Sequence, residues 1–497
     1  MKTNQSIFQM IKSYNFNFWL ANVQELFERW AWYGVFALLG IYLTGSTDEG
    51  GLGFTHVQKG EIMSYSTAIL YLLPVIFGAI SDKIGYKISL IISYIILIIG
   101  YYTMGEVSSY TGVFAAYLFI AIGAAFFKPI PSALVAINST KESVNMGFGI
   151  MYMLVNIGGF VGPGMSSYLR TTYGWKLIFI QASVVIGINL IIVLFLYKEP
   201  KKEKDGKSVL DSIKDSMKNI IVAVSDRNLA VLLFLMIGFW TMFNQLFYTL
   251  PNFLEDWVDR AKLFDQINGF SSWMARGMSD GNGVITPEWL VNLDAGAIVI
   301  LQILVSYFVT KMGYLNAMIR GFIISIIGIS ITFFTNNGLY SILGIVIFAI
   351  GEMATSPTFS SLIANISPKG KNALYQATYF LPIAVGNWVT KYISGDLYQA
   401  WSDKVSLLET EMQRRNIPMP EITNTFSKND YFAMASQKLG MTETQMTQML
   451  WDTYEPNRIW WVIGLIGLVT VIAMIVYNQM VVKPREKRGE IDLGDVD

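Results

Sequence analysis

Long apolar stretches recur along the whole chain, and each is long enough to cross a lipid bilayer as a helix. A membrane-spanning helix needs about 20 predominantly apolar residues. About twelve such stretches lie near residues 17–44, 58–80, 87–105, 111–138, 143–168, 174–197, 229–250, 289–311, 316–335, 338–365, 371–397 and 458–481. The pattern therefore predicts an all-α membrane protein with about twelve transmembrane helices.

Lysine and arginine gather in alternate connections between these stretches. They occur at 82–87, 198–218 and 311–320, at Lys369 and Lys371, and in the tail 482–497. Cytoplasmic loops of membrane proteins carry an excess of such residues. The distribution predicts a multi-pass protein of a cell membrane, the inner membrane of a bacterium, with both termini in the cytoplasm.

The chain also contains an internal repeat. Residues 121–136 read AIGAAFFKPIPSALVA and residues 349–364 read AIGEMATSPTFSSLIA, at an offset of 228 positions. The same offset relates residues 83–86 to residues 311–314. Chance similarity between apolar helices is the alternative, but two matches at one offset favour a duplicated six-helix unit.

The repeat and the long connections predict the domain organisation. An N-terminal six-helix bundle covers 1–197, a cytoplasmic linker 198–228, a C-terminal six-helix bundle 229–481, and a cytoplasmic tail 482–497. External loops are expected at 251–288 and 399–457, and an amphipathic stretch at Thr442–Thr453 predicts a surface helix.

Composition narrows the class of protein. Hydrophobic residues make up 53% of the chain and charged residues 14%, with a formal net charge of zero. Soluble proteins carry about 25% charged residues, so a soluble enzyme is excluded and the lipid bilayer is a partner. Zero net charge without a basic patch argues against nucleic-acid binding.

Two residue counts limit the chemistry further. The chain has no cysteine and one histidine, His56, which excludes disulfides, thiolate metal sites and sites with several histidines. The sequence therefore predicts no metal site, no enzymatic activity and no cofactor other than a proton as coupling ion. His56 itself is predicted to be a solvated loop residue.

Charged residues inside the predicted membrane helices are the strongest functional signal. Such charges are costly unless they are paired or solvated, and they mark transport pathways. Glu25, Glu28 and Arg29 share one face of the first helix, where Arg29 is expected to pair with Glu25 and leave Glu28 for another helix. Lys128 and Glu352 lie in opposite halves, with Ser356 aligned to Lys128 in the repeat.

This arrangement suits a zwitterionic ligand. Its carboxylate would lie near Lys128 and its ammonium group near Glu352. A carboxylate that loses its cationic partner to a ligand can gain a proton, which is a route to proton coupling without histidine. The alternative is that these charges pair only to hold helices together.

The loop between the second and third helices resembles a known signature. It reads GAISDKIGYK at 78–87, similar to the gating loop of the major facilitator superfamily, and Asp82, Lys83 and Gly85 are the candidate gate residues. The two six-helix halves fit the same superfamily. A simple tight turn is the alternative.

Further motifs resemble one branch of that superfamily, the proton-dependent oligopeptide transporter family. They are Glu25-x-x-Glu28-Arg29-Trp30 on the first helix, Lys128-Pro129 on the fourth, Tyr152-x-x-x-Asn156 on the fifth and Gly351-Glu352 on the tenth. The resemblance covers about residues 15–400 and implies proton-coupled symport of di- and tripeptides by alternating access. We expect the protein to act as a monomer.

The resemblance implies roles for individual residues. Glu25, Glu28 and Arg29 would couple protons, with Lys128 as their partner and as a ligand of the peptide carboxylate. The residues expected to contact substrate are Tyr33, Tyr71, Lys128, Tyr152, Asn156, Asn244, Glu352, Ser356 and Tyr379. Each aromatic residue in this set is equally compatible with core packing.

The chain departs from the family pattern at positions that bear on substrate. Phe36 stands where the family usually has an arginine, and Asn244 where it has an acid on helix seven. Our hypothesis is that Asp294 on helix eight replaces that acid in proton coupling. Because of these departures, the alternative remains that the protein transports another small substrate, such as nitrate, a modified amino acid or another anion. A membrane-embedded enzyme and a non-transporting sensor are weaker alternatives.

Overall fold

The computed structural model describes residues 11–12, 14–140, 143–199, 208–309, 311–312, 314–367, 372–423 and 425–488. Within these residues the chain is helical, and β pairing is restricted to two isolated bridges. Lys369, Lys371, residues 200–207 of the predicted linker and residues 489–497 of the predicted tail lie outside the described residues. The predicted all-helical class is confirmed.

The first half of the chain supplies the helices α2 to α9. They are α2 (Phe16–Thr44), α3 (His56–Leu72), α4 (Pro74–Ile84), α5 (Tyr86–Met104), α6 (Tyr110–Phe127), α7 (Pro129–Ile137), α8 (Val144–Tyr173) and α9 (Lys176–Phe195). Proline begins both α4 and α7, and it ends the preceding helix because it cannot donate a backbone hydrogen bond. The second and fourth predicted spans are therefore each made of two consecutive helices.

The second half begins after helix α10 (Val209–Val224). Its membrane-length segments are α11 (Arg227–Phe243) with α12 (Gln245–Tyr248), α16 (Pro287–Val309), α17 (Tyr314–Phe334), α18 (Gly338–Ile366), α19 (Asn372–Gln376) with α20 (Phe380–Lys391), η2 (Tyr392–Leu397) and α21 (Tyr398–Trp401), and α25 (Ile459–Tyr477) with η4 (Asn478–Val482) and α26 (Lys483–Lys487). Each predicted span of this half thus coincides with one helix or a run of consecutive helices.

Short helices fill the two long connections. They are α13 (Leu250–Trp257), α14 (Arg260–Phe270) and α15 (Ser272–Gly277) in the first, and α22 (Lys404–Arg414), α23 (Lys428–Leu439), α24 (Glu443–Tyr454) and η3 (Pro456–Arg458) in the second. The surface helix predicted around Thr442–Thr453 is confirmed as α24, which Thr442 caps through its side chain.

Among the described residues, nine helices are long and apolar enough to span a membrane, or ten if the bent pair α3–α4 counts as one span. The first predicted span, α2, contains three charged residues within its length. The eleventh is divided among α20, η2 and α21. These two segments do not meet the criteria of length and apolar composition, but they occupy the places of the first and eleventh predicted spans. With them, the described helices account for the twelve predicted spans.

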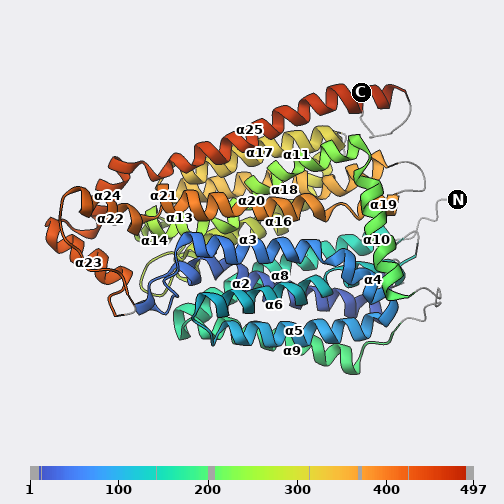
Figure 1. Ribbon diagram of the computed structural model, residues 1–497, viewed down its shortest axis with the longest axis horizontal. Helices are drawn as coiled ribbons and strands as arrows, with labels where there is room; N and C mark the ends of the chain where they lie inside the picture. The colour runs from blue at the N-terminus through green and yellow to red at the C-terminus, as the bar shows by residue number, and fades with distance from the viewer. Residues whose placement is uncertain are drawn as a thin grey trace.

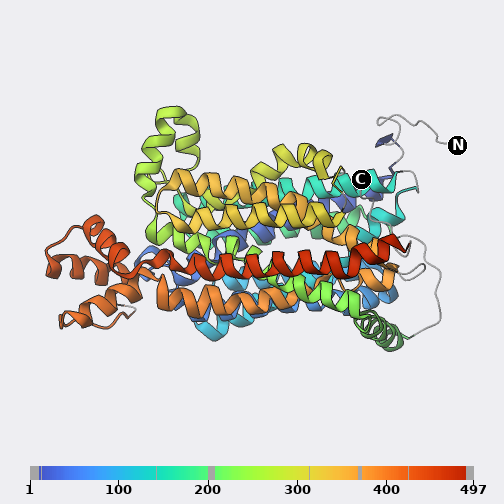
Figure 2. The same ribbon diagram turned by 90° about the horizontal axis from the view of Figure 1, so that it is seen from above.

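The helices run along one long axis, and the two halves of the chain lie side by side (Figure 1). The start of α2 and the end of α26 lie near one end of the bundle, which we call the terminal end, where α10 packs against α4 (Figures 1 and 2). Helices α22, α23 and α24 project from the opposite end, which we call the cap end (Figure 1). The candidate residues lie between these two ends.

Glycine lets α2 and α8 approach closely enough to fix the geometry of the first half. A Cβ atom at Gly158 would lie 2.5 Å from the carbonyl oxygen of Leu26, and one at Gly162 would lie 2.4 Å from that of Trp30. Such small-residue contacts bring helix backbones together in membrane proteins. The charged face of α2 is thereby held against α8.

Candidate functional site

A cavity lies between the two halves and brings together four of the predicted site residues. Tyr33 from α2 and Asn156 from α8 line one side, and Asp294 from α16 and Glu352 from α18 line the other. The cavity holds about 90 Å³ accessible to water, and one water needs roughly 10–15 Å³ in that measure. It therefore has room for several waters, and a peptide requires it to widen.

Asp294 and Glu352 form a pair of carboxyl groups in this cavity. The two side chains are close enough to interact electrostatically. Asp294 Oδ1 and Glu352 Oε2 have no hydrogen-bond partner among the described residues. Among the same residues, neither carboxyl group forms an ion pair with a lysine or an arginine. Two carboxylates cannot donate to each other, so the pair holds a proton or faces a cation.

The charged residues of α2 pair differently from the sequence expectation. Arg29 Nε donates to Glu28 Oε2 at 2.6 Å, and it lies 3.7 Å from Glu25 Oε1. The predicted pair of Arg29 with Glu25 is therefore present, but the prediction that Glu28 is left for another helix is wrong, because Glu28 also bonds to Arg29. Glu28 is fully buried and Glu25 lies at the edge of the buried region, so the arginine charge is most effective beside Glu28.

Lys128 lies at the break between α6 and α7, close to aromatic rings rather than to a carboxylate. Its Nζ is 4.5 Å from the centre of the Tyr71 ring and 5.7 Å from that of Phe380. Within the described residues no ion pair joins Lys128 to the glutamates of α2. Cation–π contacts of this kind stabilise an ammonium group and leave it available to an anionic ligand.

The remaining predicted ligands surround the cavity without lining it. Tyr152 donates from its hydroxyl group to Gln302 Oε1 at 3.5 Å, a weak contact between the halves. Asn244 Nδ2 donates to Thr390 Oγ1 at 3.4 Å. The ring of Tyr379 lies 5.1 Å from that of Phe359, between ring centres. A widened cavity is needed for these residues to contact a ligand.

Phe36 makes the boundary between the halves apolar where the related family usually has a cation. It is buried, and its ring stacks on Trp32 at 5.6 Å between ring centres. Phe247 and Tyr248 from the second half approach it at 5.9 and 5.5 Å. An anionic ligand group would therefore find no positive charge at this position.

The candidate gating loop lies between α4 and α5. Gly85 has a φ angle of 94°, which favours glycine. Tyr86 donates from its hydroxyl group to Asp82 Oδ1 at 2.9 Å, and Glu199 accepts from the backbone N–H groups of Tyr86 and Lys87 at 2.9 and 2.6 Å. The loop is thus fixed to the end of the N-terminal half, and Lys83 lies in the last turn of α4.

Sequence reasoning missed a polar cluster at the cap end. His56, predicted to be solvated, is 3% exposed, and its Nε2 lies 3.2 Å from Asp403 Oδ1. That prediction was wrong because helix α22 and the segment before it fold over the start of α3. Lys59 is fully buried and donates to Tyr248 O at 3.0 Å and Asn252 Oδ1 at 2.9 Å. Lys59 lies at the start of the predicted span 58–80, and a lysine in that place could have indicated a buried polar cluster.

A second missed cluster joins α8 to α16 near the same end. Arg170 lies 3.0 Å from Glu288, which is fully buried and also accepts from Ser167 Oγ at 2.9 Å. Asn252 Nδ2 donates to Thr44 Oγ1 at 2.8 Å. Together these bonds connect the two halves on the cap side of the cavity.

Comparison with known proteins places this geometry in a family. The model of the Major Facilitator Superfamily matches residues 24–380. The chain is 30% identical over 178 residues to the uncharacterized transporter YclF of Bacillus subtilis (strain 168), covering 35% of this chain and 36% of that protein. It is 28% identical over 232 residues to dipeptide and tripeptide permease A of Escherichia coli (strain K12), covering 46% of this chain and 44% of that protein. The matches thus span less than half the length of these relatives.

Solved structures resemble nearly the whole chain. A peptide transporter POT in complex with sulfate has a TM-score of 0.66 and 16% identity, with 97% of this chain and 96% of that chain covered. A POT family transporter in complex with 5-aminolevulinic acid also has a TM-score of 0.66, with 17% identity and 95% and 99% covered. Structural likeness at this identity shows the fold, which is that of multi-pass membrane transporters.

The sequence comparison and the structure comparison both find peptide transport proteins. The predicted resemblance to the proton-dependent oligopeptide transporters is confirmed, since peptide permeases are among the relatives and peptide transporters among the structural neighbours. The superfamily model spans more than half of the chain. The chain therefore belongs to the Major Facilitator Superfamily.

Proposed function

We propose that the protein is a symporter that carries di- and tripeptides together with protons by alternating access. The observation that carries the proposal is the cavity between the halves, lined by Tyr33 and Asn156 on one side and by Asp294 and Glu352 on the other. Transporters of this architecture bind substrate at such an interface. A single chain supplies both sides, which supports a monomer as the working unit.

The charges suit the two ends of a peptide. The carboxyl pair Asp294–Glu352 would accept the ammonium group, with the amide of Asn156 on the opposite wall. Lys128, held over the rings of Tyr71 and Phe380, would bind the carboxylate. Recognition of both ends by opposite charges favours short zwitterions over neutral solutes.

Coupling follows from the same groups. An ammonium group beside the pair compensates one negative charge, and a proton on the other carboxyl group compensates the second, so that peptide and proton occupy the cavity together. Glu28, Arg29 and Glu25 form a second coupled group, in which a proton on either glutamate weakens the pair with arginine. Protons entering with the peptide and leaving inside would drive accumulation.

The basic connections support an orientation in the cell membrane with the terminal end in the cytoplasm. The cap end then faces outward, and its hydrogen bonds and ion pairs form the outer gate. Opening requires these bonds to break while contacts near Asp82, Lys83 and Gly85 close the inner side.

The direct test is uptake of labelled dialanine into liposomes that contain the purified protein, with and without an imposed inward proton gradient. We expect accumulation only with the gradient, and we expect a proton ionophore to abolish it. Liposomes without protein control for leakage. Absence of accumulation by a folded protein would contradict the proposal.

Phe36 and Asn244 favour a second candidate function, transport of another small substrate in the same cavity. The neighbouring POT family structure in complex with 5-aminolevulinic acid makes a modified amino acid a specific candidate. Competition of uptake by unlabelled dialanine, 5-aminolevulinic acid and nitrate separates the alternatives. Stronger competition by either of the last two would replace the peptide as substrate.

A further inference from the structure

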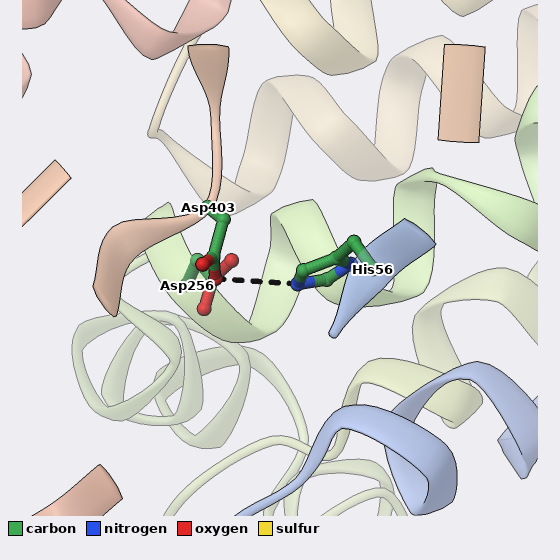
Figure 3. Close-up of side chains that lie close together, drawn as sticks. All are labelled: His56, Asp256 and Asp403. Carbon is green, nitrogen blue, oxygen red and sulfur yellow. Dashed lines mark ion pairs between the residues drawn. The ribbon is translucent and has the colours of Figure 1, made fainter. Parts of the chain in front are cut away.

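Three side chains that commonly bind metal ions meet at the cap end, outside the substrate cavity. They are His56 at the start of α3, Asp256 near the end of α13, and Asp403, which caps α22 (Figure 3). One ligand atom from each lies within 4.8 Å of the others. His56 Nε2 and Asp403 Oδ1 are 3.2 Å apart.

Neighbouring groups orient the two carboxylates. Asp403 Oδ2 accepts from the backbone N–H of Ser406 at 3.1 Å and from its hydroxyl group, and Asp256 Oδ2 accepts from Tyr398 at 2.7 Å. These bonds leave the other oxygen of each carboxylate for the cluster. Hydrogen bonds of this type hold the ligands of metal sites in place.

The histidine is an unusual buried group. His56 is 3% exposed, and its Nδ1 has no hydrogen-bond partner among the described residues. The backbone N–H of His56 donates to Gln399 Oε1 at 2.7 Å, which fixes the start of α3 against the second half. The ring nitrogen beside the carboxylates is Nε2, and an imidazole nitrogen next to two carboxylates is a donor set suited to a transition-metal ion.

The cluster is accessible to ions. All three residues line a cavity of about 640 Å³ at the cap end. Its lining also includes Glu49, Glu255 and Asp280, and these carboxylates attract cations.

We propose that His56, Asp256 and Asp403 bind a divalent transition-metal ion of the Zn²⁺ class at the interface between the halves. Zinc binds imidazole nitrogen and carboxylate oxygen at about 2.0–2.2 Å, usually with four ligands. A small inward movement of the three side chains meets those distances, and water supplies the fourth ligand.

Two lysines set the strength of the site. Lys59 and Lys428 are electrostatic neighbours of His56, but both amines have other acceptors. Lys59 binds Tyr248 O and Asn252 Oδ1, and Lys428 donates to Thr44 O at 2.8 Å and Phe54 O at 3.2 Å. Their charge weakens metal binding, so the site is reversible rather than permanently filled.

The consequence for transport rests on the proposed function. His56 belongs to the first half, and Asp256 and Asp403 belong to the second. An ion shared among them would tie the halves together on the cap side and hold the outer gate closed. Bound metal would therefore inhibit uptake.

Binding is tested first, without transport. The melting temperature Tm of the purified full chain is measured during titration with ZnCl₂, and with MgCl₂ as the control for oxygen-only sites. We expect Zn²⁺ to raise Tm in the wild type, and the rise to be lost in His56→Gln. Because the chain has one histidine and no cysteine, this substitution removes its only imidazole.

Matched variants keep the test decisive. Asp452→Asn changes an exposed cap carboxylate outside the cluster and should retain the full shift. If His56→Gln does not fold, Asp256→Asn takes its place and should also lose the shift. No Zn²⁺-dependent shift in the wild type, or an equal shift in the cluster variant, would overturn the site.

The transport arm uses Zn²⁺ outside liposomes. Inhibition of dialanine uptake in the wild type and its relief in His56→Gln would support closure of the outer gate by metal. If Zn²⁺ raises Tm through the cluster but does not inhibit uptake, the metal site stands and closure of the outer gate by metal is refuted. Failure of dialanine transport would refute the proposed function and leave the binding result standing, so the two failures are distinguishable.

Discussion

At the scale of single residues, the carboxyl pair Asp294–Glu352 carries most of the proposed chemistry. The two groups come from different helices and line the same small cavity. Asn244, at the position where the resemblance implies an acid, contacts Thr390. The hypothesis that Asp294 of α16 replaces that acid stays a prediction.

Asp294→Asn tests this arrangement. The amide cannot take up a proton, so we expect gradient-driven accumulation of substrate to be abolished while exchange across the membrane without a gradient persists. Both are measured in the same liposome preparation. Asp294→Glu keeps a carboxyl group and should retain part of the accumulation. Unchanged pH-dependent uptake by Asp294→Asn would exclude the residue from coupling.

At the scale of helices, the contact of α2 with α8 positions the charged face of α2. Gly158 and Gly162 lie where any side chain would meet the backbone of α2. Backbone atoms cannot turn aside as a flexible side chain can, so the helices must separate to admit a methyl group. Close packing here is a requirement for the geometry of Glu28 and Arg29.

Gly158→Ala should therefore destabilise the protein. Overpacking of this kind costs about 1–3 kcal/mol, which we expect as a lower Tm in detergent. The matched control is Gly149→Ala on the same helix, because a Cβ atom there meets nothing within 4 Å. An equal effect of both substitutions would show that helix propensity, and not the contact with α2, is responsible.

The cap helix α22 contains a buried carboxylate, Glu411, that contributes to the stability of the fold. Hydrogen bonds from Arg414, together with those from Arg415 and Tyr454, lower the pKa of buried Glu411 to about 2 despite the opposing effect of burial. An ordinary glutamate has a pKa of about 4.3. A carboxylate with a lowered pKa stabilises the fold above its ordinary pKa, and this contribution is lost as the pH falls toward 2.

Glu411→Gln should lower Tm by several degrees at neutral pH. The difference from the wild type should shrink below about pH 4, because protonation removes the same charge from the wild type. Tm measured across the pH range checks this, with exposed Glu443→Gln as the control. A difference that does not change with pH would mean that packing, and not charge, is affected.

At the scale of the whole molecule, polar bonds on the cap side connect the two halves, and we call them the seal. Thr44, His56 and Lys59 of the first half bond to residues of the second half there. The long axis of the bundle separates this seal from the terminal end, where α10 packs against α4 (Figure 1). Alternating access requires the seal to open in every cycle.

A covalent link across the seal should stop the cycle. Thr44 and Asn252 are hydrogen-bonded at 2.8 Å, and the chain has no native cysteine to interfere. In the double variant Thr44→Cys with Asn252→Cys, oxidation should abolish uptake and a reducing agent should restore it. The two single variants are the controls. Full uptake with the disulfide formed, verified by mass, would contradict opening at this end.

Sequence alone determined the helical class, the spans and the superfamily. Hydrophobic length and loop charge depend on local residues, which is why α24 follows from sequence. Motif resemblance named Tyr33, Asn156 and Glu352, and the departure at Asn244 led to Asp294. These four residues line one cavity. Their roles in transport stay predictions.

Only the tertiary structure decided which charges pair and which are buried. Arg29 bonds to Glu28 in addition to the Glu25 that helical spacing indicated. His56 is buried by a segment about 350 positions away in the chain, at Asp403. Contacts between such distant segments depend on how whole helices pack, and a pattern of neighbouring residues does not contain that information.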